Sequence, residues 1–308
     1  KRKCDAEHGT GTVIIGFGNE SFDCSGGVIE DIVMHPIEFA PAVERCMKEL
    51  DEQNTVCLTF PTAFFGAEEL VLDTIASVIG ERNIPVAGSS CGNEKEGRGT
   101  YVSYNGTVYP AASIFLFVHN KNGRVAVVKK DMFIPMRTEF RATSVNPRKR
   151  IIYELDGKPA AMELARQLHF ELHELDSNEG GHLDDYGLGR MIGRELYTTD
   201  IARITREKGL EMLATVYGGT RLCLLKRGKY DSFLPDVIAS VRKNISKPGF
   251  VLYVNCISLT KYYKSVDWLG VFCAGISTPA PIHAGISGFG EQLGRANINK
   301  TMLAVAFE

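Results

Sequence analysis

Apolar positions in the first ninety residues form a regular succession of strand-like and helix-like segments. Short apolar, β-branched runs at 12–17, 55–60 and 85–88 predict strands. Between them, at 43–50 and 70–78, apolar residues recur every three or four positions, as on one face of a helix. This β-α-β-α-β order predicts a core of parallel strands.

A different pattern begins near residue 100, where short strand-like segments are separated by polar turns. These segments lie at 100–104, 113–119, 125–129, 138–143 and 151–155. Asn-Gly pairs at 105–106 and 122–123 each separate two of them, and Asn-Gly between apolar runs is a strong signal for a hairpin. We therefore expect antiparallel hairpins in this part of the chain.

The second half repeats the mixture of hairpins and helix-linked strands. After a helix expected over 157–172, the polar, glycine-rich stretch 174–192 predicts a domain boundary. The segments expected beyond it are strands between 194 and 226, a helix at 234–245, a strand at 249–255 and a helix at 259–269. We predict an α/β fold with two domains, 1–175 and 176–308, each a mixed parallel and antiparallel β-sheet flanked by helices. Such sheets can stack as a layered sandwich.

Composition and charge remove several classes of function. A formal net charge of −2 gives no electrostatic basis for binding nucleic acid or an anionic membrane. The longest apolar run, near 111–118, is far too short to span a bilayer. The eight cysteines include no C-x-x-C pair, which is typical of reduced thiols in a cytoplasmic protein. We expect a cytoplasmic protein without nucleic-acid or membrane partners.

The glycine-dense segment before the last strand is the most distinctive local feature. Gly285, Gly288 and Gly290 allow the backbone to turn sharply, and Glu291 follows them directly. The apolar run 302–307 then predicts a buried strand. We expect a rigid turn that presents one carboxylate beside free backbone amides, as a small polar ligand would require.

A second polar turn follows the strand at 85–88. Ser89, Ser90, Cys91 and Gly92 supply hydroxyl groups and consecutive amides, a nest that can bind a carboxylate or phosphate. An ordinary polar turn is the alternative. Neither phosphate-loop fingerprint applies, because G-x-x-x-x-G-K-[ST] is absent and the glycines near the end of the chain occur in the reverse of the dinucleotide-binding order.

A cysteine near the end of the chain has a possible catalytic role. Cys256 follows Asn255 at the end of an apolar strand. With His283 as base and Asp267 or Glu291 as orienting acid, its thiol would form a nucleophilic catalytic group. Simple packing of a strand-end cysteine is the alternative.

Two histidines have a spacing that could bind a metal ion. His169 and His173 would be neighbours on one helix face. Their sequence fits neither H-E-x-x-H nor H-x-x-E-H, and solvent-exposed helix histidines are the alternative.

Four stretches together resemble the FIST family of sensory proteins, in its two-part form with amino- and carboxy-terminal modules. They are the strand that runs into Gly-Ser-Ser-Cys-Gly-Asn-Glu at 88–94, the segment 152–160, the apolar strand 250–256 that ends in cysteine, and Gly-Phe-Gly-Glu at 288–291 followed by Asn297, Asn299, Thr301 and Met302. Two positions depart from the family pattern. No arginine follows shortly after Cys256, and Asn93 precedes the acid Glu94.

The resemblance implies a cytoplasmic sensory module that binds a small ligand such as an amino acid and is not an enzyme. It also implies a signalling output protein or domain as a partner. Some family members bind haem as nitric-oxide sensors, which makes haem the alternative cofactor; otherwise no cofactor is expected. A cysteine-dependent enzyme that uses Cys256 and His283 is the second alternative.

We expect ligand-binding residues in both polar turns. The predicted set is Ser89, Ser90, Cys91, Gly92, Glu94, Asn255, Cys256, Gly290, Glu291 and Asn297. The nest at 89–92 suits an α-carboxylate, and Glu291 suits an α-ammonium group. We therefore predict that the two turns, one from each half of the chain, converge on a cleft between the domains.

Overall fold

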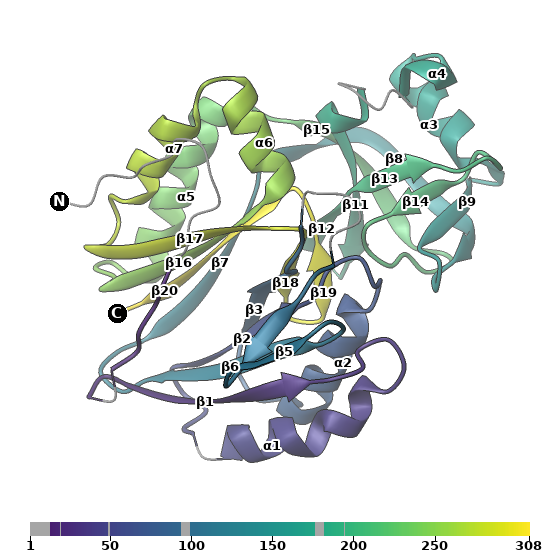
Figure 1. Cartoon of the computed structure of the whole chain (residues 1–308). Helices are drawn as coiled ribbons and strands as arrows, with labels where there is room; N and C mark the ends of the chain where they lie inside the picture. The colour runs from purple at the N-terminus through teal and green to yellow at the C-terminus, as the bar shows by residue number, and fades with distance from the viewer. Residues whose placement is uncertain (1–12, 19, 49, 94–98, 176–181, 194) are drawn as a thin grey trace. The chain divides into compact units, whose positions relative to one another are not determined.

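A computed structural model describes residues 13–18, 20–48, 50–93, 99–175, 182–193 and 195–308 (Figure 1). The chain divides into two compact units, each built from separate stretches of sequence. Unit 1 comprises residues up to Lys130, Tyr230–Arg295 and Met302–Glu308, and unit 2 comprises Asp131–Lys229 and Ala296–Thr301.

This division differs from the predicted one at 1–175 and 176–308. Unit 2 begins before the expected break at 174–192 and continues through it. The physical reason is strand pairing, because the last strand, β20 (Thr301–Phe307), lies beside β7 (Val125–Asp131) in one sheet. The end of the chain therefore completes a unit that the first residues began.

The first sheet of unit 1 combines parallel and antiparallel strands. The strands that unit 1 contributes lie in the order β1 (Phe22–Ile29), β6 (Ser113–Asn120), β2 (Thr55–Pro61), β3 (Val86–Ser89) and β18 (Glu291–Leu293). β2 and β3 are parallel, as the β-α-β pattern predicts, and β18 is antiparallel to β3. α1 (Ala40–Lys48) and α2 (Glu68–Ile79) cover one face, where Val43 and Val71 join the same buried core as Phe115.

The second sheet of unit 1 lies under the later helices (Figure 1). Its order is β17 (Ile282–Gly288), β16 (Phe250–Cys256), β20 and β7. The helices are α5 (Tyr230–Asn244), α6 (Ile257–Ser265) and α7 (Leu269–Ile276). All residues of β20 are buried, and the Phe307 ring packs edge-on against Phe22 of β1 at 5.6 Å. The two sheets of unit 1 are thus layered between helices, which confirms the predicted α/β class.

Unit 2 is an antiparallel sheet with one main helix. The strand order is β12 (Glu195–Thr199), β11 (Tyr186–Ile192), β15 (Arg221–Arg227), β8 (Phe133–Asn146), β9 (Ile151–Leu155), β14 (Leu210–Met212) and β13 (Ile201–Ile204). α3 (Ala160–Leu168) buries Leu164 and Leu168 in one core with Ile152, Leu210 and Leu222. The smaller elements of unit 1 are η1 (Pro36–Phe39), β4 (Val102–Tyr104) and β5 (Thr107–Tyr109). Those of unit 2 are β10 (Lys158–Pro159), α4 (Leu172–Leu175), η2 (His182–Asp185) and β19 (Ala296–Ile298).

Several predicted elements are corrected by the structure. The described part of 12–17 forms no strand, and the Asn-Gly pair at 122–123 joins β6 to β7, which lie in different sheets. The helix expected over 259–269 is two helices, separated at 266–268. Most of the glycine-dense segment is the strand β17, so the turn itself is confined to 289–290.

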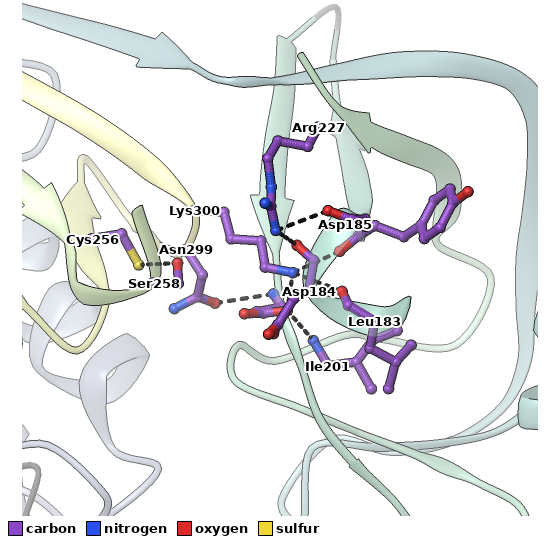
Figure 2. A network of polar contacts seen from close by, with 11 residues as sticks. Leu183, Asp184, Asp185, Ile201, Arg227, Cys256, Ser258, Asn299 and Lys300 are labelled. Atoms are coloured by element: carbon purple, nitrogen blue, oxygen red, sulfur yellow. Dashed lines mark hydrogen bonds and ion pairs between the residues drawn. The ribbon is translucent and has the colours of Figure 1, made fainter. Parts of the chain in front are cut away.

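The segment Ala296–Thr301 is fixed within unit 2 by a buried ion pair (Figure 2). Lys300 is 2% exposed, and its Nζ lies 2.8 Å from Asp200 Oδ1. Nζ also donates hydrogen bonds to the carbonyl oxygens of Leu183 and Tyr186, at 3.1 and 2.6 Å, and lies 4.9 Å from the centre of the Phe133 ring. Burial raises the pKa of the Asp200 carboxyl, although the Lys300 charge opposes this shift.

Removing the cation from this pair should weaken the fold. Lys300→Met leaves a buried carboxylate without its counter-charge, so we expect a loss of about 3–5 kcal/mol in the free energy of unfolding, measured by urea titration. Adding Asp200→Asn should restore part of the loss, because the pair then carries no charge. Strict additivity of the two substitutions would contradict the assignment of an interacting pair.

Candidate functional site

The carboxyl ends of two parallel strand pairs meet within unit 1. β2 and β3 form one pair, and β16 and β17 form the other. Gly288, the last residue of β17, lies beside Cys256 in the strand register. A Cβ atom at position 288 would overlap Ser89 Oγ at the end of β3. We call the segments 89–93, 255–260 and 287–292 the strand-end cluster.

The two polar turns expected from the sequence are hydrogen-bonded to each other. Ser89 is directly opposite Glu291 in the β3–β18 pairing. The Ser90 backbone N–H donates to the Gly290 carbonyl at 2.9 Å, and the Phe289 N–H donates to the Ser90 carbonyl at 3.1 Å. Gly290 has a φ of 123°, which favours glycine at this position. Both turns therefore belong to unit 1, whereas we expected one from each of two domains.

The floor of the strand-end cluster is polar and buried. Ser89, Ser90, Glu291 and Gln292 are each at most 2% exposed. Gln292 Nε2 donates a hydrogen bond to Ser90 Oγ at 2.9 Å. The Glu291 carboxylate thus lies beneath the surface, whereas the sequence predicted a charge presented at a turn.

The β16–α6 junction contributes a second group of polar atoms. Asn255 Nδ2 donates to Thr260 Oγ1 at 2.8 Å and to the Cys256 carbonyl at 3.1 Å. Thr260 Oγ1 also lies 2.6 Å from Ser287 Oγ on β17. Asn255 is 6% exposed, and within the described part of the chain its Oδ1 has no hydrogen-bond partner. Most buried acceptors in folded proteins have a hydrogen-bond partner, so this atom is an exception.

Cys256 is an internal part of this junction. It is 4% exposed, precedes the first turn of α6, and its Sγ accepts a hydrogen bond from Ser258 Oγ at 3.2 Å (Figure 2). The first backbone N–H groups of a helix have no partner within the helix. The β16–α6 junction therefore combines hydroxyl and amide donors near the Asn255 acceptor.

The end of β2 is joined to the same cluster through Cys91. The Cys91 N–H donates to the Pro61 carbonyl at 2.7 Å, and the Ala63 N–H donates to the Cys91 carbonyl at 2.8 Å. Burial raises the pKa of the Cys91 thiol to about 11, so it stays protonated near neutral pH. The Cα of Gly92 packs directly against the Phe289 ring, which leaves no room for a side chain there.

One predicted site residue, Asn297, is not part of this cluster. Asn297 belongs to unit 2, where its Nδ2 donates to the Leu213 carbonyl at 3.1 Å and its own carbonyl accepts a hydrogen bond from Arg190. Glu94 lies outside the described residues. The other members of the predicted set are brought together in the cluster: Ser89, Ser90, Cys91, Gly92, Asn255, Cys256, Gly290 and Glu291.

The predicted Cys256–His283 pair does not form. In the parallel β16–β17 register, Cys256 is paired with Gly288 whereas His283 is paired with Val251. Five residues of strand separate the two positions, or about 16 Å at 3.3 Å per residue. His283 therefore cannot act as the base for the Cys256 thiol.

The histidine pair considered for metal binding is also separated. His169 ends α3 in the left-handed conformation, with φ of 60°, and His173 lies in the next helix, α4. Among the described residues, no group of three or more His, Cys, Asp or Glu side chains is arranged to hold a metal ion.

Three residues of the cluster were not predicted from the sequence, namely Thr260, Ser287 and Gln292. The available signal was their position next to predicted strand ends, where ligand-binding loops commonly begin. Thr260 lies one helical turn beyond Cys256, and Ser287 is beside Asn255 in the β16–β17 register. The second relation cannot be read without knowing that β16 and β17 pair in parallel.

A cavity of about 400 Å³ lies at the opposite ends of β2 and β3. Its lining is mostly polar, with Glu52, Asn54, Asn83 and Arg124 among its residues. Arg124 is held by Glu308, whose Oε2 lies 3.1 Å from its Nε. This cavity is therefore remote along the strands from the strand-end cluster.

The fold and site define an α/β protein with a polar site at the carboxyl ends of parallel strands, a common position for ligand binding. The model of the FIST N domain matches residues 4–158, so the chain belongs to the FIST family of sensory domains in signalling proteins. No curated protein matches the chain. None of the helices in the described part of the chain has the length and apolar character needed to cross a membrane.

The close approach of β17 to β3 can be tested with two glycines of one strand. In Gly288→Ala the new methyl group overlaps Ser89, so we expect a loss of about 1–3 kcal/mol in the free energy of unfolding. Gly285→Ala is the matched control, since its nearest atom is Tyr253 Cβ at 3.9 Å. Equal stability of the two variants in urea titrations would contradict the described contact.

Proposed function

We propose that this chain is the ligand-binding module of a sensory protein, and that a small polar metabolite such as an amino acid binds at the strand-end cluster without being chemically changed. The observation that carries the proposal is the meeting of the β2–β3 and β16–β17 carboxyl ends, marked by the contact between Ser89 and Gly288. Loops at the carboxyl ends of parallel strands are where open α/β sheets bind their ligands.

The polar groups of the cluster suit the two charged ends of an amino acid. Ser258 and Thr260 are partly exposed and Ser287 is exposed, so their hydroxyl groups, with the first amides of α6, can receive a carboxylate. The Asn255 Oδ1 acceptor can receive an N–H donor such as an ammonium group. The buried Glu291 carboxyl group adds oxygen atoms that can accept a hydrogen bond at the same place.

The signalling context follows from the family. Sensory domains of this family imply an output domain or partner protein that responds to ligand binding, and we propose that this chain acts with one. We propose a cytoplasmic location on the same basis. The described cysteines are free, and Cys57, Cys223 and Cys256 are buried, which agrees with reduced thiols.

The two alternative functions receive less support. A cysteine-dependent enzyme would need another base, because His283 is remote from Cys256 along the strands. Haem binding would need a histidine in an apolar pocket. Among the described histidines all but His119 are exposed, and His119 Nδ1 lies 3.2 Å from Thr55 Oγ1. We therefore propose binding without catalysis and without a haem cofactor.

A thermal-shift screen against amino acids and small carboxylates tests the proposal. A ligand at 100 times its dissociation constant stabilises the folded state by about 2.7 kcal/mol, which raises the melting temperature by about 5 °C for a chain of this size. We expect at least one compound to give this shift. Thr260→Val, which removes a hydroxyl group from the partly exposed side of the cluster, should abolish it.

The matched control for this screen is Thr278→Val. Thr278 is also a threonine that bonds a helix carbonyl, but it lies at the end of α7, away from the carboxyl ends of the strands. The shift should persist in this variant. A flat panel for the unaltered protein, with no Soret absorbance after incubation with haem, would contradict small-ligand sensing altogether.

A further inference from the structure

An exposed aromatic residue occupies a strained position beside the strand-end cluster. Phe64 follows the end of β2 and has a φ of 72°, a left-handed backbone conformation that is unfavourable for a bulky side chain. Its side chain is 64% exposed, so packing in the core does not compensate for the strain. Backbone strain of this kind is concentrated at ligand-binding and switch regions.

Contacts join this ring to the candidate site. The Ala63 N–H, next to Phe64, donates to the carbonyl of Cys91 at 2.8 Å. The Phe64 ring packs edge-on against Phe289, with centroids 5.1 Å apart and an interplanar angle of 73°. The Phe289 ring in turn lies directly on Gly92. The two rings therefore border the loops 89–93 and 287–291.

We propose that Phe64 and Phe289 form a subsite for a planar apolar group, so that the ligand is an amino acid or related acid with an aromatic side chain. This inference rests on the proposed function and narrows its ligand class. The strand-end polar groups would hold the charged end of the ligand, and its ring would complete the aromatic cluster.

The size of the feature favours a small ligand over a protein partner. A stable protein interface buries about 800 Å² on each side. The aromatic contact between Phe64 and Phe289 consists of one pair of rings. A further ring adds to such a pair by edge-to-face or offset packing. The face of Phe64 that is open to solvent is where this ring would lie.

Calorimetric titration with L-phenylalanine and L-alanine tests the subsite. We expect L-phenylalanine to bind at least about tenfold more tightly than L-alanine, because burial of its ring adds apolar contact. Phe64→Gly should reduce this preference to near unity. Since glycine accepts a positive φ without strain, the variant should melt at the same or a higher temperature.

Ile282→Ala is the control, because Ile282 is a similarly exposed apolar residue on β17. It should keep the full preference for L-phenylalanine. Equal affinity for the two amino acids, or a preference that survives in Phe64→Gly, overturns the subsite and leaves amino-acid sensing intact. Binding of neither amino acid at millimolar concentration overturns the subsite, and a flat thermal-shift panel would then reject the proposed function separately.

Discussion

The course of the final segment of the chain is the constraint on which the structure depends. β18 completes a sheet of unit 1, Ala296–Thr301 belongs to unit 2, and Met302–Glu308 returns to unit 1. Lys300 fixes the middle of this path through its buried contact with Asp200. All residues of β20 are buried, so this strand contributes to the interior of unit 1. The integrity of both units therefore depends on the same short segment.

The same segment also positions the candidate site. Gly290 and Glu291 bring β18 alongside β3, and the absence of a side chain at Gly288 lets β17 approach Ser89. The resulting cluster has a buried polar floor and a partly exposed side formed by Thr260 and Ser287. Because the fold and the site share these residues, the stability of each site variant has to be measured together with its binding.

Local sequence signals predicted the individual elements well where the local backbone decides them. A hairpin forms at Asn105-Gly106, since both residues adopt the positive φ that its turn requires. Its second strand is β5, and the expected segment 113–119 pairs with β1 and β2 instead. The Asn-Gly pair at 122–123 misled, because the strands on either side pair with distant partners in different sheets. Hydrophobic periodicity is local, so it could not reveal units assembled from separate stretches of the chain.

The same distinction applies to the site. Ser89–Gly92 and Asn255–Cys256 were identifiable because polar residues directly follow apolar strands. The burial of Glu291 and the displacement of His283 from Cys256 depend on strand register, which the sequence does not specify. The positive φ of Phe64 could not be predicted for another reason. Only glycine, asparagine and aspartate commonly adopt a positive φ, so a phenylalanine in the sequence does not indicate one.

Hydrogen exchange in the presence of L-alanine or L-phenylalanine at millimolar concentration tests the central claim most directly. We expect slower amide exchange at 89–93, 257–260 and 287–291, since a bound ligand opposes local opening of the segments that contact it. Protection confined to the cavity at the opposite strand ends, around 52–55 and 124–125, would contradict the assignment of the ligand site. Unchanged exchange throughout would contradict amino-acid binding itself.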